Sequence, residues 1–510
     1  MSGSPETRSH LGQSRQEATT RLFSSFQRTE TEKLMTKDAL SIVDKAIQAV
    51  SPVSAVKNHL RFDPYNCVLR AGASDSSNTK SYNLQDFDDI LIIAFGKASS
   101  AMATTVIKQL TEQKMSNGNI PSIQGIVVVK DEHCTSEEQT FLESHNTVLY
   151  EASHPVPDKR GALAAKEIMA RVSTMASPRS LVICCISGGG SALFCLPQDR
   201  LSLDDLKKTS SVLLASGLSI QEINVIRKRL EDGKGGRLAA AAYPSTVLSL
   251  VLSDVLGDPL DLIASGPTVP DTSSFIDAWQ LIEKNGLQTK LPSSVVQMIK
   301  DGLDGSLPDS PSEDHPIFQE GKCKTVVVAN NELAVEAAAA EAKRRGYGTV
   351  VLGSRIEGEA KHAATFYSAM AQHLALQRED KHVPFPIAKL PTALIAGGET
   401  TVSIGPDADG KGGRNQELGL AAALKFKELG LRNVVLASVG TDGTDGPTDA
   451  AGAVVDGATV ARLTGSVEDA LRRHDAYTYL NQVEEDGHTP LIITGPTGTN
   501  VADVCVVLIR

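Results

Sequence analysis

The sequence predicts an α/β fold divided into two α/β domains. Apolar runs of strand length alternate with amphipathic stretches of helical length, which is typical of a largely parallel sheet covered by helices. The chain has 510 residues, more than one hydrophobic core usually serves, so two domains are expected. Several predicted strands run directly into glycine-rich polar turns, and ligands bind at such strand ends.

The first predicted domain covers residues 36–300. An amphipathic helix begins near Thr36, and the preceding residues 1–35 lack helical or strand-like periodicity, so we expect a disordered tail there. Helices are expected near residues 97–110, 160–176, 203–217 and 220–230. The predicted strands are Ile90–Phe95, Gly125–Val129, Leu181–Ile186 and Val247–Leu252.

The second predicted domain covers residues 322–510. It follows Leu303–Gly321, whose Pro, Ser, Asp and Glu residues are typical of an interdomain connection or an exposed loop. Helices are expected at residues 332–345, 358–377 and 415–429. The predicted strands are Thr325–Ala329, Thr349–Leu352, Ala393–Ala396, Val434–Val439, Leu491–Thr494 and Val504–Ile509.

Composition excludes several classes of protein. Hydrophobic residues make up 41% and charged residues 22%, which is ordinary for a globular chain. The net charge of -11 argues against nucleic acid or an anionic membrane as the main partner. No apolar run reaches the roughly 18 residues of a membrane span, and no secretory signal is evident. The cysteines show no C-x-x-C spacing, so we expect a cytoplasmic protein, with a mitochondrial address left open by the Ser-, Thr- and Arg-rich start.

The turn after Leu181–Ile186 is the densest glycine-rich turn. Small residues leave backbone N–H groups free to surround an oxyanion, which suggests phosphate or carboxylate binding. P-loop and dinucleotide spacings are absent, and a nucleophile elbow at Ser191 would need a closing glycine that the chain lacks. A purely structural turn is the alternative. The substrate-binding candidates here are Ser187, Gly188, Gly189, Gly190 and Ser191.

Two charged residues follow predicted strands of the first domain. Lys97 stands just after Ile90–Phe95, where its ammonium group would point into the ligand crevice of an α/β sheet. An ordinary surface lysine is the alternative. Asp254 follows Val247–Leu252, where a carboxylate could accept a hydroxyl proton or hold a metal that bridges phosphates. Capping of the next helix is its alternative role.

A third candidate cluster lies within a predicted helix. Asn224, Arg227 and Lys228 are spaced at i, i+3 and i+4, so they share one helical face. That face could offer an amide and two cations to one anionic ligand. A solvated basic face is equally compatible with the spacing.

The second domain repeats the glycine-rich turns. Arg414 could present a planar guanidinium to a phosphate. Asp442 and Asp445 lie amid glycines without the spacing of an EF-hand, yet the two carboxylates could hold magnesium together with phosphate oxygens, or form Asx turns. The cofactor-binding candidates in these turns are Gly397, Gly398, Glu399, Thr400, Gly412, Gly413, Asn415, Gly440 and Thr441.

One set of motifs spans nearly the whole chain after about residue 36. It consists of Phe95-Gly-Lys-Ala98, His154-Pro-Val-Pro-Asp158, Ser187-Gly-Gly-Gly-Ser-Ala192, Ser253-Asp-Val255, Ser265-Gly-Pro-Thr268, Gly397-Gly-Glu-Thr400, Gly412-Gly-Arg-Asn-Gln-Glu417, Gly440-Thr-Asp-Gly-Thr-Asp-Gly446 and Thr494-Gly-Pro-Thr-Gly-Thr-Asn500. In order and spacing this set resembles the class II glycerate kinases, whose C-terminal part is called the MOFRL domain. Residues 1–35 are not part of that family pattern.

The resemblance implies an ATP-dependent kinase of D-glycerate, with magnesium accompanying ATP. It implies a Rossmann-like N-terminal domain, a MOFRL-type C-terminal domain and an active site in the cleft between them. Lys97 and Arg414 would be the principal cations. Enzymes of this kind usually give 2-phosphoglycerate, and 3-phosphoglycerate stays open as the product. Only small-molecule partners are implied, and the chain could act as a monomer or homodimer.

These observations give a working hypothesis for the chemistry. The turn at Ser187–Ser191 and the face of Asn224, Arg227 and Lys228 would hold glycerate, while the C-terminal glycine turns would hold ATP. Asp254 would orient the acceptor hydroxyl or bind magnesium. Two alternatives stay open: a serine hydrolase that uses Ser191, and a nucleotide or metabolite sensor without turnover.

Overall fold

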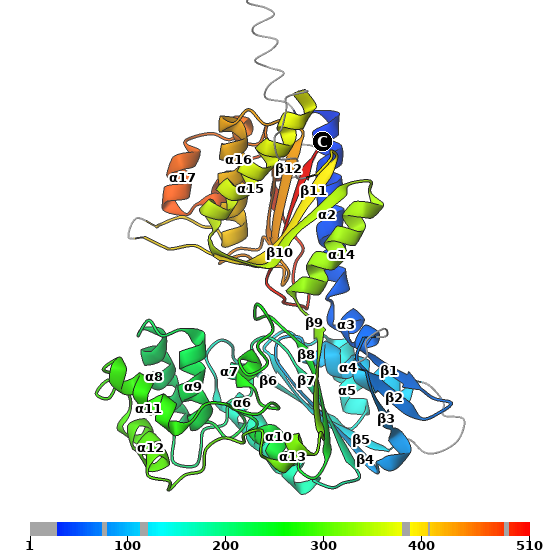
Figure 1. Cartoon of the computed structure of the whole chain (residues 1–510), viewed down its shortest axis with the longest axis vertical. Helices are drawn as coiled ribbons and strands as arrows, with labels where there is room; N and C mark the ends of the chain where they lie inside the picture. The colour runs from blue at the N-terminus through cyan, green and yellow to red at the C-terminus, as the bar shows by residue number, and fades with distance from the viewer. Residues whose placement is uncertain (1–27, 74–78, 113–120, 380–387, 406–407, 484–488) are drawn as a thin grey trace, which may run out of the picture. The chain divides into compact units, whose positions relative to one another are not determined.

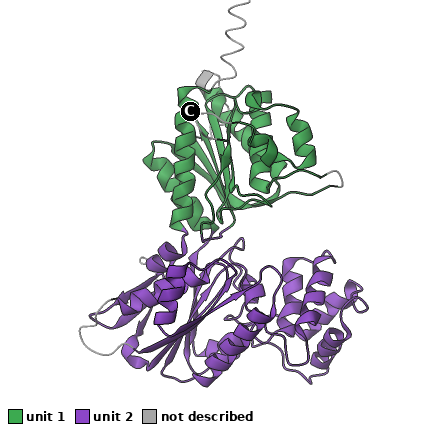
Figure 2. Ribbon diagram, turned by 180° about the vertical axis from the view of Figure 1, so that it is seen from behind, with its two compact units in different colours: residues 1–49, 331–497, 502–510 green, residues 50–330, 498–501 purple. Residues whose placement is uncertain are grey.

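The computed structural model describes residues 28–73, 79–112, 121–379, 388–405, 408–483 and 489–510. These residues divide into two compact units, shown in different colours in Figure 2. Unit 2 contains residues 50–330 and 498–501. Unit 1 contains residues 331–497 and 502–510 together with the chain up to Ala49. Both units have helices packed on a β-sheet, so the predicted fold class is confirmed.

Unit 2 is built on a six-stranded parallel sheet with the order β6-β5-β4-β7-β8-β9 (Figure 1). The chain starts at β4, adds β5 and β6 on one side, and then returns to add β7 on the other side. The strand order therefore reverses between β4 and β7, and open α/β sheets bind ligands at such a switch point. The strands are β4 (Asp89–Phe95), β5 (Ser122–Lys130), β6 (Thr147–Ala152), β7 (Ser180–Ile186), β8 (Thr246–Leu252) and β9 (Cys323–Ala329).

The central strands of this sheet are buried on both faces, as their continuous apolar runs require. Leu91, Ile93 and Phe95 pack against helices α6 and α10, while the alternate residues Ile90 and Ile92 are equally buried. The helices around the sheet are α3 (Pro52–His59), α4 (Ser99–Thr111), α5 (Ser136–Ser144), α6 (Lys159–Thr174), α7 (Gly190–Leu193), α10 (Arg237–Ala242) and α13 (Pro316–Gln319), with 3-10 turns η1 (Leu84–Asp86) and η2 (Ile263–Ser265).

Two further parts of unit 2 lie beside this layer. A lobe of four helices has a core of its own, in which Phe275, Ile226 and Leu213 are buried. A small antiparallel sheet of three strands precedes β4. The lobe consists of α8 (Leu203–Leu214), α9 (Ile220–Leu230), α11 (Phe275–Lys284) and α12 (Ser293–Leu303), and the small sheet of β1 (Leu60–Asp63), β2 (Val68–Ala71) and β3 (Lys80–Asn83).

Unit 1 has a mixed six-stranded sheet with the order β10-β11-β15-β12-β13-β14. Only β10 and β11 pair in parallel, so this sheet is not the largely parallel one expected. Because β11 and β12 both run antiparallel to β15 between them, their carboxyl ends share one edge with the start of β15. The strands are β10 (Gly348–Glu359), β11 (Thr392–Thr401), β12 (Val434–Gly440), β13 (Gly452–Asp456), β14 (Leu491–Ile492) and β15 (Asp503–Ile509).

Helices cover this second sheet, and α16 packs against both α15 and β13. Its residues Leu418, Ala422 and Phe426 enter the main core of the unit. The helices of unit 1 are α2 (Glu30–Ala49), α14 (Asn331–Arg344), α15 (Ala360–Ala375), α16 (Arg414–Glu428), α17 (Val467–Arg473) and α18 (Ala476–Leu480), with 3-10 turns η3 (Leu376–Glu379) and η4 (Val460–Arg462).

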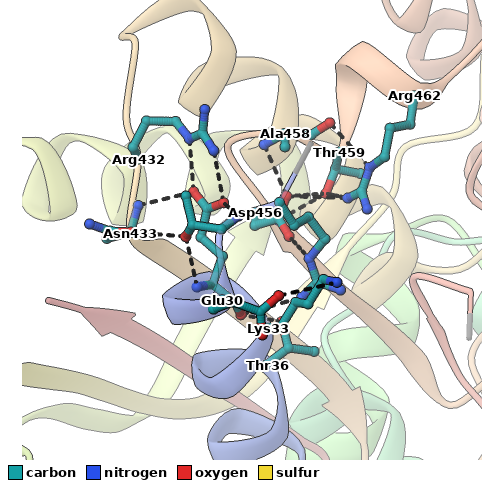
Figure 3. Close-up of polar contacts among 12 residues, drawn as sticks. Glu30, Lys33, Thr36, Arg432, Asn433, Asp456, Ala458, Thr459 and Arg462 are labelled. Atoms are coloured by element: carbon teal, nitrogen blue, oxygen red, sulfur yellow. Dashed lines mark hydrogen bonds and ion pairs between the residues drawn. The ribbon is translucent and has the colours of Figure 1, made fainter. Parts of the chain in front are cut away.

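Helix α2 belongs to unit 1 although unit 2 follows it in the chain. Buried ion pairs and an apolar helix face bind it to the rest of unit 1. The Glu32 carboxylate accepts hydrogen bonds from Arg432 at 2.9 and 3.0 Å and from the Asn433 amide at 3.1 Å. Just before the helix, Arg28 Nε lies 2.6 Å from Asp456 Oδ2. Figure 3 shows Arg432, Asn433 and Asp456 beside the start of α2, where Glu30 and Lys33 lie.

Two expectations about the boundaries are wrong. The helix begins at Glu30, so residues 30–35 are not part of a tail, while residues 1–27 lie outside the described residues. Leu303–Gly321 is not the connection between the units. Ile317 within it is buried in the unit 2 core, β9 follows in the same unit, and the chain passes to unit 1 only after Asn330.

Within the part of the chain that the structure describes, no single helix is long and apolar enough to cross a membrane. The bent pair α2 and α3 meets the length and composition criterion only when both helices are taken together.

Candidate active site

The switch point of the unit 2 sheet brings two of the predicted motifs together. The Lys97 amide donates to the Gly188 carbonyl at 2.8 Å, and the Ala98 amide donates to the Ser187 hydroxyl at 3.0 Å. The turn after β4 and the turn after β7 are thereby joined. The amides of Gly188 and Gly189 donate to no group in the described chain, so both are available to an anion.

Asp254 and His154 lie on the glycine turn. A Cβ atom built on Gly188 would fall 2.2 Å from Asp254 Oδ2, and one on Gly189 would fall 3.1 Å from His154 Nε2. Gly189 also has φ +82°, which disfavours other residues. The glycines therefore let a carboxylate and an imidazole approach the backbone of the turn.

Lys97 is the cation of this cluster. Its ammonium group has no ion pair in the described part of the chain, and a Cβ on Gly189 would lie 3.4 Å from its Cγ. Burial raises the pKa of Asp254, although Lys97 opposes that rise. Burial, with Lys97 and Lys130, lowers the pKa of His154 to about 4, so this imidazole is neutral at pH 7.

The helical face proposed from the sequence is only partly available. Lys228 is buried, and its ammonium lies 3.3 Å from Asp261 and 3.4 Å from Asp271. Asn224 is also buried and accepts a hydrogen bond from Ser265 at 2.9 Å. Arg227 is half-buried without an ion pair in the described chain, and burial lowers its pKa. Two of the three residues thus have internal partners.

Ser191 is linked to that internal network. Its hydroxyl lies 3.1 Å from the hydroxyl of Ser265, and its carbonyl accepts from the Lys234 ammonium at 2.9 Å. Ala264 and Ser265 have φ of 50° and 62°, which is strained for residues other than glycine. No imidazole or carboxylate contacts the Ser191 hydroxyl among the described residues, so the base that a serine nucleophile requires is not beside it.

In unit 1, Arg414 opens α16 at the edge shared by β11, β12 and β15. Its Nε and Nη2 donate to the Asp503 carboxylate at 2.6 and 2.9 Å, and its Nη1 lies 3.0 Å from Glu399. Burial acts to lower the pKa of Arg414, but the hydrogen bond with Asp503 and the negative charges of Asp503, Glu399 and Asp445 together outweigh burial and raise that pKa. The guanidinium is therefore oriented by protein carboxylates and keeps only part of its donors for a ligand.

The two aspartates predicted to hold magnesium have different surroundings. Asp445 is buried and accepts hydrogen bonds from the amides of Asn415 and Gln416 at 3.1 and 2.9 Å, so it caps α16. Burial raises its pKa to about 6. Asp442 forms a turn by accepting from the Thr444 amide at 3.0 Å. The described residues contain no group of three or more His, Cys, Asp or Glu side chains placed to hold a metal ion.

Most other predicted nucleotide contacts lie in close backbone packing. A Cβ on Gly397 would fall 1.8 Å from Asn331 Oδ1, and one on Gly398 would fall 2.1 Å from the Ile356 carbonyl oxygen. The buried Thr441 hydroxyl donates to Ala502, and Gly440 ends β12. Thr400 is also buried, and Glu399 is the exposed member of its turn. Apart from Glu399, these positions determine the backbone packing at this edge of the sheet and present no side chain to solvent.

A cavity of about 420 Å³ opens beside Arg414 within unit 1. Its volume lies in the range of ligand pockets. Gly412 and Gly413, both predicted to bind the cofactor, line it, as do Asp442 and Asp445. Its remaining walls are Val402, Ile404, Ala408, Gly410, Glu417, Thr444, Gly446, Pro447 and His474.

Comparison with known proteins identifies the family. Residues 38–300 match the family described as a domain of unknown function, DUF4147, and residues 392–503 match the MOFRL family. The glycerate 2-kinase of Pyrococcus horikoshii is 36% identical over 92% of this chain and 96% of its own. The D-glycerate 2-kinase of Thermotoga maritima is 37% identical over 93% and 98%. The chain belongs to the glycerate kinase family.

A crystal structure of a glycerate kinase from Thermotoga maritima superposes on this member of the family with a TM-score of 0.75. The two chains are 34% identical, and the match covers 94% of this chain and 100% of the other. The resemblance predicted from the motifs is thus confirmed. The DUF4147 match lies mostly in unit 2, and the MOFRL match lies in unit 1.

Sequence reasoning missed several residues of both sites in this glycerate kinase family member. Lys130 ends β5, and His133 follows it, at the same carboxyl edge as Lys97. In unit 1, His474 Nδ1 lies 2.7 Å from the buried Glu417 carboxylate beside the cavity. A search of every strand end for polar residues would have found Lys130. Glu417 ends the motif that begins at Gly412, but no local pattern pairs it with His474, which lies 57 residues further along the chain.

Proposed function

We propose that this protein transfers the γ-phosphoryl group of ATP to a hydroxyl group of D-glycerate, with the 2-hydroxyl as the acceptor. The names of the relatives from Pyrococcus horikoshii and Thermotoga maritima support both the substrate and the position. The observation that carries the proposal is Lys97, whose ammonium group has no ion pair among the described residues and which lies against a turn with two amides that donate to none of them, at the sheet's switch point. Phosphoryl transfer needs such cations and N–H donors more than covalent chemistry.

The acid would bind at the carboxyl edge of the unit 2 sheet. The free amides of Gly188 and Gly189 offer hydrogen bonds to its oxygens, and Lys97 neutralises negative charge. Asp254 lies against Gly188 and is the carboxylate closest to this turn. Because burial raises the pKa of Asp254, this carboxylate is more basic than an exposed aspartate and suits a role as acceptor of the hydroxyl proton.

The nucleotide would bind in the unit 1 cavity. The apolar walls Val402, Ile404 and Pro447 suit the flat face of a base, while Arg414 suits a phosphate. Magnesium would enter with ATP and neutralise charge on its phosphates. Of the two predicted ligands, Asp442 fits this ion better. Both carboxylate oxygens of Asp445 already accept hydrogen bonds from amides at the start of α16, whereas Asp442 accepts from the Thr444 amide through one oxygen.

An ADP-release assay against a panel of small hydroxy acids tests the proposal. We expect release that depends on D-glycerate, and phosphorus NMR should show a product phosphorylated at the 2-hydroxyl. A phosphate at the 3-hydroxyl would contradict the assigned acceptor alone. ATP binding without ADP release for any acid would instead indicate a sensor. Labelling of Ser191 by a fluorophosphonate would favour a hydrolase.

A further inference from the structure

The unit 2 sheet edge carries a cationic side chain beyond those in the proposed acid site, Lys130, and a neutral imidazole, His154. Phe95 of β4 pairs with Val128 of β5, so Lys97 and Lys130 each lie two residues past the same pair. Lys130 in turn pairs with Ala152 of β6, and His154 lies two residues past Ala152. Neighbouring strands are about 4.8 Å apart. Lys97, Lys130 and His154 therefore occupy adjacent positions along one edge.

The carboxylates near this edge form no ion pair with the two lysines among the described residues. Lys130, like Lys97, has no ion pair in the described part of the chain. Asp131 is held by Arg160 through hydrogen bonds of 2.7 and 2.9 Å. Glu151 accepts from the amide of Glu132 at 3.2 Å. The two ammonium groups thus keep their charge available to a ligand.

The lowered pKa values of two histidines agree with a positive potential at this edge. Burial is the largest cause of the lowered pKa of His133, and Lys130 and Lys97 add to it. The same two lysines contribute to the low pKa of His154. A field that disfavours protonation of an imidazole also attracts an anion to the same place. This agrees with the geometry, which brings the lysines to one corner of the sheet.

The position of Asp254 decides which end of the acid would enter this corner. Asp254 follows β8, which is separated from β4 by β7, whereas Lys130 follows β5 on the other side of β4. The substrate carboxylate would be repelled at Asp254 and attracted at Lys130. The opposite orientation would place like charges together. The acceptor hydroxyl therefore belongs near Asp254 and the carboxylate near β5 and β6.

We propose that Lys130 and His154 form a subsite for the carboxylate of the hydroxy acid, with Lys97 between that carboxylate and the acceptor hydroxyl. This inference rests on the proposed function and adds a basis for specificity. The ligand class is a short 2-hydroxy acid with a free carboxylate. An uncharged analogue of the same size, such as the amide of glyceric acid, lacks the charge that the subsite selects.

Kinetics of Lys130→Met test the subsite, with Lys166→Met as a matched control on the exposed face of α6. We expect KM for D-glycerate to rise about tenfold or more, as for loss of a charge-assisted hydrogen bond. KM for ATP should stay unchanged in both variants. Lys130→Arg keeps a cation and should recover most of the affinity for D-glycerate. If the lysine acted only through its aliphatic chain, Lys130→Met would keep that affinity instead.

Calorimetry of D-glycerate binding makes the test independent of turnover. Wild type should bind glycerate at least about tenfold more tightly than Lys130→Met does, and more tightly than it binds glyceramide. If wild type releases no ADP yet shows this pattern, the proposed function fails and the subsite stands. Equal binding by both proteins, equal binding of glycerate and its amide, or no binding by wild type would overturn the subsite.

Should Lys130→Met fail to fold, protection of Lys130 by glycerate against reductive methylation decides instead, and absence of protection overturns the proposal.

Discussion

The cations of unit 2 differ in whether a carboxylate already neutralises them. Lys228 and Arg229 share the buried carboxylate of Asp271, and Lys234 lies 2.5 Å from Glu231. Lys97 and Lys130 have no such partner among the described residues. A paired cation in a buried network mainly stabilises the fold, because its charge is already satisfied. The unpaired cations at the strand ends are therefore the ones that a substrate can use.

Replacement of Lys97 should lower turnover more than substrate affinity. We expect Lys97→Met to reduce kcat about 100-fold or more, since its charge is proposed to act on the transferring phosphoryl group. Steady-state kinetics with D-glycerate measure this, with Lys166→Met as the control. A folded Lys97→Met protein with the kcat of wild type would disprove the assigned role.

His154 should make the folded protein less stable in mild acid. Its pKa is lowered from 6.5 to about 4 by burial and by the two lysines, so folding favours the neutral imidazole. The resulting stability is present above pH 6.5 and is lost as the pH falls towards 4. His154→Gln should show a weaker loss over this window in urea unfolding. Equal slopes for both proteins would show that His154 titrates normally.

The glycine turn between β7 and α7 is the element on which the acid site depends. Gly189 and Gly217 have similar φ of +82° and +78°, but nothing lies within 4 Å of a Cβ on Gly217. Both alanine variants carry the backbone strain, and only Gly189→Ala meets His154. We expect Gly189→Ala to lose most of its kcat/KM while Gly217→Ala keeps it. Equal activity of the two folded variants would separate the turn from catalysis.

Helix α2 should stabilise unit 1 through Glu32. The Glu32 side chain is fully buried, whereas that of Glu30 is 93% exposed. Breaking a fully buried ion pair costs about 3–5 kcal/mol; because Arg432 is 35% exposed, we expect about 2–4 kcal/mol for loss of Glu32, and under about 0.5 kcal/mol for loss of an exposed carboxylate. Glu32→Ala should therefore lower the free energy of unfolding in denaturant far more than Glu30→Ala. Equal midpoints for the two variants would show that α2 contributes little through this pair.

The sequence predicts an element best when local pattern and final environment agree. Strands β4 and β7 are continuous apolar runs because both of their faces are buried, and they were predicted within a residue or two. Strand β6, with exposed and half-buried residues, gives no such run and was missed. The site follows the same rule. Lys97 could be predicted as a site residue because it directly follows a recognisable strand. The carboxylate partners of Lys228 lie 33 and 43 residues away, so no local spacing could show that its charge is already paired.

At the scale of the whole molecule, each unit is assembled from separated segments of the chain. Unit 1 takes α2 from before unit 2, and unit 2 takes residues 498–501 from within the last part of unit 1. In that short segment the Thr499 hydroxyl donates to the Val50 carbonyl at 2.6 Å. Periodicity identifies helices and strands but not such exchanges. The sequence therefore predicted two α/β units and placed the boundary between them incorrectly.

The central claim is that the acid binds at the unit 2 sheet edge and the nucleotide in the unit 1 cavity. A crystal structure with D-glycerate and a non-hydrolysable ATP analogue tests it most directly. We predict the acid against Lys97 and the Ser187–Ser191 turn, and the nucleotide against Arg414 within the cavity walls. Density for the acid away from Lys97, or for the nucleotide away from that cavity, would contradict this account.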